Sequence, residues 1–586
     1  MFYPFKDAKF SNISCYILLP LQVQYPILGA MKNILPHFAI KLVLVLWVSF
    51  AQGQVRTIRI TLPANAAPIA VHAREILGEQ ITRRCNAKIV IGKTAGLYID
   101  LSIERSGLPE SFRVEDGSPA HIRIIGADEQ GLLYGIGKWL RSSRFDQGGF
   151  TPGLWRGNSA PEGKLRGMYF ASHFGNFYEA APVVEVQHYV DELALWGVNY
   201  LVLHFPQFQF TAFEDVAAQQ LLERIRLIMR VAKSNGMKVG LIQVANGGFK
   251  STPKELFNVS FPDDLQRRGD FGVNLNPATP AAHALLLKNW LALLEQFKTV
   301  GLDAVVFWPY DEGGCGCTEC WPWGAKGFPK LCRDLSTIAK EKYPGMQVVV
   351  STWVYDTPVA GEWEGLSKFL LQGKSWVNFI MADSHEGYPH FPLEQGVPGG
   401  LPLLNFPEIS MWGQSPWGGY GANPLTGRLQ RLWNETEHKL SGGFPYSEGI
   451  YEDLNKVICS QLYWNGQKST AEIVREYIAF EFSPVVVEEV AKAFAILEEN
   501  HQREQIATSA NEAFRLIEAA SAKLTPQVRK SWRWRIVYLR VLIDRELLST
   551  HGDLKGEVLK KAFNELTTIY HAENGHSMPI HPPVIK

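Results

Sequence analysis

The chemically suggestive residues of this sequence are carboxylates that follow apolar, strand-forming runs. Residues 305–308 read VVFW, and the run ends shortly before Asp311-Glu312-Gly313-Gly314. Because a charged side chain is costly inside a buried strand, acids are expected where the strand ends and solvent or substrate begins. A carboxylic acid placed there can donate a proton to a leaving group, and a second carboxylate can activate water. The sequence therefore predicts acid–base chemistry at the end of this strand.

Further acids follow other predicted strands. Asp383 comes after the run at 376–382, and Glu408 follows the run at 401–406. Converging carboxylates flanked by aromatic rings suit the hydrolysis of a glycosidic bond. Glu312, Asp383 and Glu408 are therefore the candidate catalytic residues. The candidates for substrate binding occupy comparable positions: Asp311, Arg166, His173, His204, Asn246, Trp308, Trp353, His385, Trp412 and Glu448.

Several of these residues also admit a structural interpretation. Asp311 could cap its own turn through the backbone, and Glu408 could pair with an arginine such as Arg166. Glu448 stands in SEGIYED, which also resembles the start of a helix, where acids favour the helix dipole. Asn246, in Asn-Gly-Gly, could belong to a simple turn. For each of these residues, a role in the site and a structural role both stay open from the sequence alone.

The elements that would position these residues alternate between strands and helices. Eight strands are predicted, at 165–170, 198–205, 238–244, 303–309, 347–353, 376–382, 401–406 and 442–447. Amphipathic helices are predicted between several of them, at 184–196, 217–234, 281–299, 329–343 and 426–440. Eight strands with crossover helices over roughly 300 residues predict a (β/α)8 TIM barrel, whose strand ends gather on one rim. A Pro/Gly-rich loop replaces the helix between the sixth and seventh strands.

Two further units are predicted around the barrel, which we place at 159–466. Residues 55–158 read in the order β-α-β-β-β-α, which fits an α+β accessory domain. Residues 467–586 read as a helical domain, and Ser469 and Glu472 form a capping box at its start.

Residues 1–54 are predicted to be an export signal preceded by a spurious extension. Lys32 and Lys41 precede the apolar residues 42–50, and small and polar residues follow. This order is typical of a secretory signal, and the apolar part is short for a membrane span. We therefore expect the true start at Met31 and a periplasmic or secreted protein, with a membrane-anchor helix as the alternative.

Composition excludes some partners and leaves the cysteines open. Lys+Arg and Asp+Glu both count 58, so no net charge favours nucleic acid or an anionic membrane. No phosphate-binding loop follows a strand, and we expect no cofactor, an oligosaccharide or polysaccharide substrate, and an oligomeric state that the sequence does not define. The cysteines that cluster behind the carboxylates are Cys315, Cys317, Cys320 and Cys332. Disulfides or free structural thiols compete with a metal site, and either would brace the loop.

The order of the three units resembles that of the bacterial α-glucuronidases. The resemblance implies a general acid at Glu312 and a water-activating pair at Asp383 and Glu408, with inversion. The adjacent Asp311-Glu312 is similar to the pair of the β-hexosaminidases, which implies the alternative of an N-acetylhexosamine-directed hydrolase that uses the substrate's own acetamide. DEGGCGCTEC resembles the Cys-rich segment of hydrolases related to endo-β-N-acetylglucosaminidases. A glycan-binding protein without turnover is the alternative outside enzymes.

Overall fold

The computed structural model describes most of the chain from Gly53 to Ala572, together with Val584 and Ile585. The residues left out are 1–52, 93, 119, 163–164, 174, 263–271, 312, 358, 385–386, 410–421, 437, 503–504, 573–583 and 586. The predicted export signal and the candidates Glu312, His385 and Trp412 therefore lie outside the described residues.

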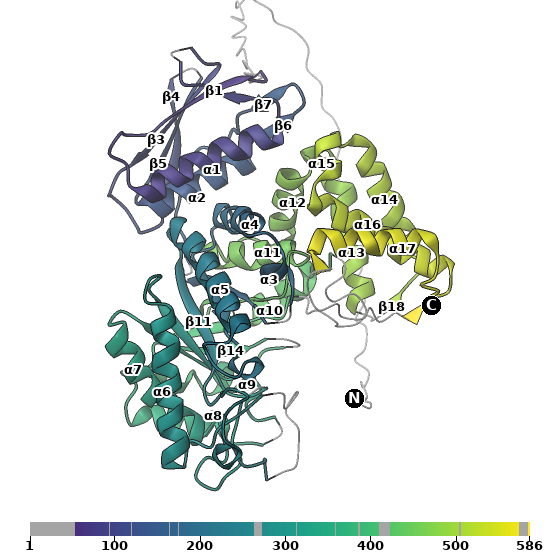
Figure 1. Ribbon diagram of the computed structural model, residues 1–586. Helices are drawn as coiled ribbons and strands as arrows, with labels where there is room; N and C mark the ends of the chain where they lie inside the picture. Colours follow the sequence, from purple (N-terminus) through teal and green to yellow (C-terminus); the bar gives the residue numbers. More distant parts are fainter. Residues whose placement is uncertain are drawn as a thin grey trace, which may run out of the picture. The chain divides into compact units, whose positions relative to one another are not determined.

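A closed barrel of eight parallel strands forms the centre of the chain (Figure 1). The strands are β9 (Leu165–Phe170), β10 (Tyr200–His204), β11 (Lys238–Val244), β12 (Ala304–Trp308), β13 (Gln347–Ser351), β14 (Phe379–Asp383), β15 (Leu403–Phe406) and β16 (Leu440–Gly443). Each strand pairs in parallel with the next, and β9 pairs with both β10 and β16, which closes the ring. The predicted (β/α)8 barrel is thus confirmed.

The eighth strand is interrupted, although the sequence predicted it as one run. Gly442 has φ +117°, a conformation that favours glycine. The backbone then resumes pairing with β9 at β17 (Tyr446–Ser447), where the Tyr169 amide donates to the Pro445 carbonyl at 3.0 Å. The break lets Tyr446 and the residues after it reach the same rim as the other strand ends.

Helices cover the outside of the barrel; five of them lie where the amphipathic spacing predicted, whereas those at 362–371 and 453–464 were not predicted. The helices are α4 (Val183–Leu195), α5 (Val216–Ser234), α6 (Pro280–Gln296), α7 (Gly327–Lys342), α8 (Glu362–Leu371), α10 (Thr426–Thr436) and α11 (Asp453–Trp464). Among the described residues between β14 and β15, the helical elements are the short α9 (His390–Glu394) and a 3-10 turn at Pro398–Gly400, in agreement with the predicted Pro/Gly-rich loop.

The N-terminal part of the described chain is a mixed sheet with two helices. Its elements are β1 (Thr57–Thr61), α1 (Pro68–Arg84), β2 (Lys88–Ile89), β3 (Leu97–Ile103), β4 (Phe112–Ser118), β5 (His121–Gly126), α2 (Glu129–Arg141) and β8 (Gly157–Ser159). A small hairpin, β6 (Arg144–Asp146) and β7 (Gly149–Thr151), follows α2. The sequence did not predict β4, which pairs antiparallel with β5 and buries Phe112 and Val114 while its charged residues are less buried.

The C-terminal part is helical, as predicted. It contains α12 (Thr470–Glu481), α13 (Val487–Gln502), α14 (Ala510–Lys523), α15 (Pro526–Lys530), α16 (Trp532–Ser549) and α17 (Glu557–Tyr570). The capping box of Ser469 and Glu472 is present. The helices α15 and α16 are separated at Ser531, whose side chain accepts from the Trp534 amide at 3.3 Å and caps α16. Among the described helices, none combines the length and the apolarity that crossing a membrane requires.

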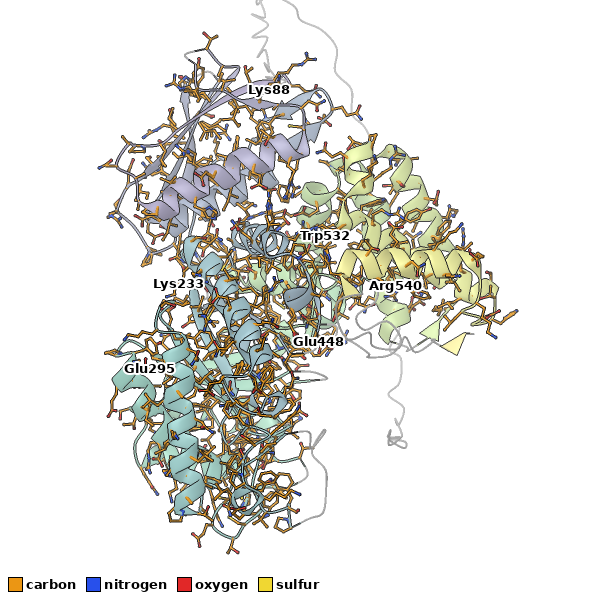
Figure 2. All side chains as sticks on the ribbon, in the orientation of Figure 1. Lys88, Lys233, Glu295, Glu448, Trp532 and Arg540 are labelled. Atoms are coloured by element: carbon orange, nitrogen blue, oxygen red, sulfur yellow. The ribbon has the colours of Figure 1, made fainter. Side chains whose placement is uncertain are left out.

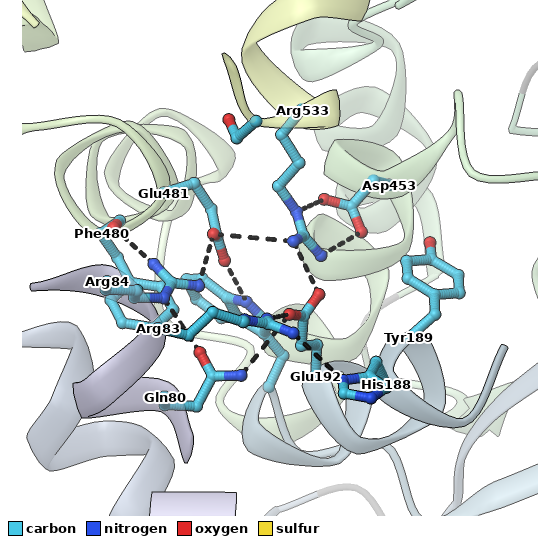
Figure 3. A network of polar contacts seen from close by, with 12 residues as sticks. Gln80, Arg83, Arg84, His188, Tyr189, Glu192, Asp453, Phe480, Glu481 and Arg533 are labelled. Carbon is cyan, nitrogen blue, oxygen red and sulfur yellow. Dashed lines mark hydrogen bonds and ion pairs between the residues drawn. The ribbon is translucent and has the colours of Figure 1, made fainter. Parts of the chain in front are cut away.

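A buried ion-pair network joins helices of all three parts (Figure 3). Arg533 of α16 is 6% exposed, and its Nε donates to Asp453 Oδ2 of α11 at 2.7 Å. Its Nη1 donates to Glu192 Oε2 of α4, also at 2.7 Å. We call the group of Arg533, Glu192, Asp453, Arg83, Arg84 and Glu481 the junction network.

Two arginines of α1 extend the junction network toward the N-terminal sheet. Arg83 pairs with Glu192, and Arg84 Nη2 donates to Glu481 Oε2 of α12 at 2.8 Å. Burial alone raises the pKa of Glu192, but the charges of Arg533, Arg83 and Arg84 outweigh it and lower that pKa to about 2. The buried carboxylates of the network therefore stay ionised because the arginine charges compensate for their burial.

Candidate active site

A layer of five aromatic rings lies inside the barrel near the carboxyl ends of the strands. The rings belong to Tyr169, Trp308, Trp353, Phe406 and Tyr446. Trp308 and Trp353 stack with centroids 5.3 Å apart and planes at 27°. Trp308 of β12 lies 4.9 Å from Phe406 of β15, and these strands are not neighbours. Rings of non-adjacent strands meet only through the barrel interior, so we call this group the aromatic layer.

Two of the predicted acids lie one strand repeat beyond the aromatic layer. Glu408 follows Phe406 by two residues, and Glu448 follows Tyr446 by two. Because side chains of an extended backbone alternate, residues two apart point to the same side. Glu408 also forms a parallel bridge with Tyr446, which keeps the extended backbone beyond the end of β15. Both carboxylates thus belong to the rim above the aromatic layer.

Asp383 completes this arc of acids on the adjoining strand. It is the last residue of β14 and stands in register with Phe406 of β15. Its side chain is half-buried, whereas Glu408 and Glu448 are buried. The structure therefore brings Asp383, Glu408 and Glu448 to the same end of three sequential strands, next to the aromatic layer.

Glu408 and Glu448 have defined partners. Arg428 of α10 lies 3.5 Å from Glu408 Oε2, and Tyr446 Oη donates to Glu448 Oε1. The structural interpretation of Glu408 suggested an arginine such as Arg166 as its partner, and the arginine that pairs with it is Arg428. This ion pair holds the Glu408 carboxylate in place at the rim.

A buried pair supports the end of the eighth strand from behind. The Glu448 amide donates to Glu452 Oε1 at 2.8 Å, and Lys456 Nζ lies 3.3 Å from Glu452 Oε2. Burial raises the pKa of Glu452 to about 7; Lys456 opposes the shift and the charge of Glu408 adds to it. Glu452 is fully buried, so it has no access to substrate. Because it accepts from the Glu448 amide, it orients the backbone of Glu448. Figure 2 labels Glu448 among the side chains at the barrel.

Hydrogen bonds hold the loop after β12 in place before Asp311, at Pro309 and Tyr310, and after Gly313, at Gly314. Tyr310 is fully buried and its hydroxyl donates to Glu362 of α8, while Trp323 Nε1 donates to the Pro309 carbonyl at 2.7 Å. Asp311 has φ 74°, a left-handed conformation that is uncommon outside glycine and that concentrates at functional sites. Asp311 therefore combines a rim position with an unusual backbone conformation.

Asn246 anchors the other side of this loop. Its Nδ2 donates to the Gly314 carbonyl at 2.8 Å and to the Leu275 carbonyl at 3.0 Å, and its Oδ1 accepts from the Gly314 amide at 3.0 Å. The side chain is fully buried. Both protons of the amide are used, so Asn246, predicted to bind substrate, instead positions the loop that follows β12.

We expect Asn246→Ala to lower the free energy of unfolding by about 2–3 kcal/mol, because it leaves backbone groups of Gly314 and Leu275 buried without partners. Urea unfolding measures the loss. Asn258→Ala is the matched control, since half-buried Asn258 donates only one bond, at 3.1 Å, to the same Gly314 carbonyl. Its expected cost is about 1 kcal/mol. Equal losses in the two variants would contradict the anchoring role of Asn246.

The two predicted histidines meet at the ends of the first two strands. The rings of His173 and His204 are 4.8 Å apart, edge to face, and both residues are buried. His204 Nδ1 lies 2.8 Å from the Ile242 carbonyl, and Ser172 Oγ donates to the His204 carbonyl at 2.9 Å. The histidines therefore form a pair on the rim at the ends of β9 and β10, and their role in substrate binding stays a prediction.

Arg166 lies apart from the other candidates. It is the second residue of β9, at the amino end of the barrel, and its side chain is fully buried. Its Nη2 donates to Glu110 Oε2 at 2.7 Å, and its guanidinium lies over the rings of Trp464 and Tyr134. This placement gives Arg166 a structural role between the barrel and the N-terminal sheet, in place of the predicted contact with substrate.

Four residues of the site were not predicted. Tyr169, Phe406 and Tyr446 complete the aromatic layer, and Arg428 pairs with Glu408. The signal for Phe406 and Tyr446 was present, because each precedes a predicted acid by two residues. Arg428 gave no such signal, since it belongs to a helix that the sequence places only on the outside of the barrel.

Three of the four clustered cysteines come together behind the loop. The ligand atoms of Cys315, Cys317 and Cys320 all lie within 4.8 Å of one another. Cys332 belongs to α7 and is not a member of this group. All six cysteines of the described part of the chain are free thiols.

Comparison with known proteins places the chain by its fold. The sequence matches no family model and no curated protein. A family GH115 4-O-methyl-α-glucuronidase with specificity for decorated arabinogalactans is similar with a TM-score of 0.56 and 11% identity, over 89% of this chain and 77% of that one. A family 89 glycoside hydrolase from Clostridium perfringens is similar with a TM-score of 0.56 and 13% identity, over 86% of this chain and 64% of that one. The predicted resemblance to barrel glycoside hydrolases is confirmed at the level of the fold.

Proposed function

We propose that this protein is a glycoside hydrolase that cleaves O-glycosidic bonds of complex glycans, with an α-glucuronidase-like, inverting mechanism. The observation that carries the proposal is the arc of Asp383, Glu408 and Glu448 directly above the aromatic layer, in which Trp308 is partly exposed. Aromatic faces bind the apolar faces of sugar rings, and carboxylates supply the proton transfers of hydrolysis. The similarity to the GH115 4-O-methyl-α-glucuronidase supports this choice of sugar class.

The proposed roles divide between two sides of the site. Glu312, named from the sequence, protonates the leaving oxygen. Its neighbour Asp311 stands in a left-handed backbone conformation. Asp383 and Glu408 activate the attacking water, and Arg428 holds Glu408 in position through their ion pair. Tyr446 orients Glu448, which is proposed to contact the sugar.

Asp383→Asn and Glu408→Gln test the water-activating pair. Each is expected to lower kcat about 10²–10⁴-fold with little change in KM, because the base acts in the transition state. The loss should be the same for good and poor leaving groups, since every substrate needs the water. Glu435→Gln on the exposed side of α10 is the matched control and should keep full activity. Unchanged turnover in both site variants would remove the pair from the mechanism.

A second candidate is an N-acetylhexosamine-directed hydrolase that uses the substrate's acetamide. The left-handed backbone at Asp311 favours it, because that residue would orient the acetamido group. Early proton NMR spectra of the released sugar separate the two proposals. Inversion of the anomer supports the α-glucuronidase-like reaction, and retention supports the acetamide-assisted one. Sugar binding without turnover would instead support a glycan-binding protein.

We also infer that the protein is exported. The basic start at Met31, the short apolar run at 42–50 and the small residues that follow support a secretory signal. An exported hydrolase would meet polymeric glycans outside the cytoplasm, in line with the proposed substrate.

A further inference from the structure

Three cysteine side chains converge in the loop between β12 and α7. Cys315, Cys317 and Cys320 offer sulfur atoms that all lie within 4.8 Å of one another. Cys315 and Cys320 are buried and Cys317 is half-buried. Three thiols at this spacing could bind one ion together, and the proposed hydrolysis does not use them.

The backbone of the loop holds the three sulfurs together. The amides of Cys320 and Trp321 both donate to the Cys317 carbonyl at 2.9 Å, which makes a tight turn, and the Gly327 amide donates to the Cys320 carbonyl at 3.1 Å. The Gly316 amide donates to the Val259 carbonyl at 2.8 Å. A Cβ at Gly316 would lie 2.1 Å from the Ser260 carbonyl oxygen, so this position admits only glycine. The sulfur cluster is therefore built into the loop.

An oxygen atom faces the cluster from the neighbouring segment. Asn276 Oδ1 lies 3.5 Å from Cys315 Sγ and 3.4 Å from Cys317 Sγ, and the Asn276 side chain is buried. The Ala278 amide donates to the same oxygen at 3.0 Å and fixes its direction. Three sulfurs and one oxygen thus approach a common point from two segments of the chain.

The chemistry of this donor set distinguishes a metal from a disulfide. A disulfide joins two sulfurs and would leave the third thiol beside it. A tetrahedral zinc ion with Zn–S bonds of about 2.3 Å requires sulfurs about 3.8 Å apart, which the observed limit of 4.8 Å accommodates. Thiolates select zinc and other soft ions over calcium or magnesium.

We propose that Cys315, Cys317 and Cys320 bind one Zn²⁺ ion as thiolates, with the Asn276 carboxamide oxygen in the fourth position. The site is structural, because a closed set of protein ligands leaves no position for a substrate. Zinc would tie the loop after β12 to the segment at Asn276. It would do so independently of whether the barrel hydrolyses glycans.

Metal analysis of the full-length protein, purified without chelator, tests this site. Wild type is expected to contain about one zinc ion per chain. Cys320→Ser should lose most of that zinc. Cys332→Ser is the matched control, since it removes a buried cysteine of the same sequence cluster that is not one of the three ligands, and it should retain the metal.

Thiol chemistry on the wild type supplies a readout that does not depend on any variant folding. Titration with an organomercurial should release zinc in step with the modification of three thiols. A zinc-free protein with a disulfide between any two of the three cysteines, found by mass spectrometry, would overturn the proposal. Three freely reactive thiols without metal would overturn it as well, and stoichiometric copper would overturn the assignment to zinc.

Discussion

Replacement of Glu312 by Gln is expected to abolish turnover of natural glycans selectively. General acid catalysis contributes about 10²–10⁴-fold, and the need for it grows with the basicity of the leaving oxygen. Glu312→Gln should therefore lose activity by that factor on natural glycans and lose little on aryl glycosides with activated leaving groups. Steady-state kinetics on a series of aryl leaving groups of graded pKa measures the difference as a steeper dependence on that pKa.

Glu319→Gln is the matched control for this prediction. Glu319 is exposed and belongs to the same loop, so its replacement removes one nearby carboxylate without touching the proposed site. It should leave the leaving-group dependence as in wild type. Full activity of Glu312→Gln on natural glycans would remove Glu312 from the role of acid, while the contrast with Asp383→Asn and Glu408→Gln separates loss of the acid from loss of water activation.

Replacement of Arg533 by Ala is expected to lower the free energy of unfolding by about 3–5 kcal/mol, because it leaves buried carboxylates without their cation. Asp453 and Glu192 each accept from Arg533 at 2.7 Å, and both are almost fully buried. Chemical denaturation at neutral pH measures the loss. The difference in the free energy of unfolding between the variant and wild type should shrink as the pH falls from about 4.5 toward 2. Glu192 has a folded pKa of about 2, below its ordinary value, so its ion pair stabilises the fold fully above about pH 4.5. This stabilisation is lost as Glu192 becomes protonated.

Arg529→Ala is the matched control for the junction network. Arg529 is exposed in α15, shortly before Arg533 in the sequence, and its replacement should change stability by about 0.5 kcal/mol or less. A loss of similar size in both variants, or a loss in Arg533→Ala that does not depend on pH, would contradict the buried ion pairs as its cause.

The barrel could be predicted from the sequence because its strands have a strong local signal. β9 and β11 have the predicted bounds, since strands of a parallel barrel are covered on both faces and form continuous apolar runs. β4 escaped prediction because FRVEDGS carries charges, and only its pairing with β5 makes it a strand.

The candidate site could be predicted only where a strand end determines it. Asp383 and Glu408 reach one rim because parallel strands end together. Asn246 and Arg166 have partners far away in the sequence, Gly314 and Glu110, and no local pattern indicates which backbone a buried amide or guanidinium will meet. The same holds for Arg428. Long-range polar partners are the part of this site that a sequence does not specify locally.

Ion pairs between the first and last thirds of the chain affect its biosynthesis. Arg84 pairs with Glu481, and Lys138 and Arg141 both pair with Glu476, across more than 300 residues of intervening chain. The ribosome therefore releases these cations long before their anions exist. The helices α1 and α2 can gain the stabilisation from these ion pairs only after α12 has emerged, which places this part of folding late in synthesis.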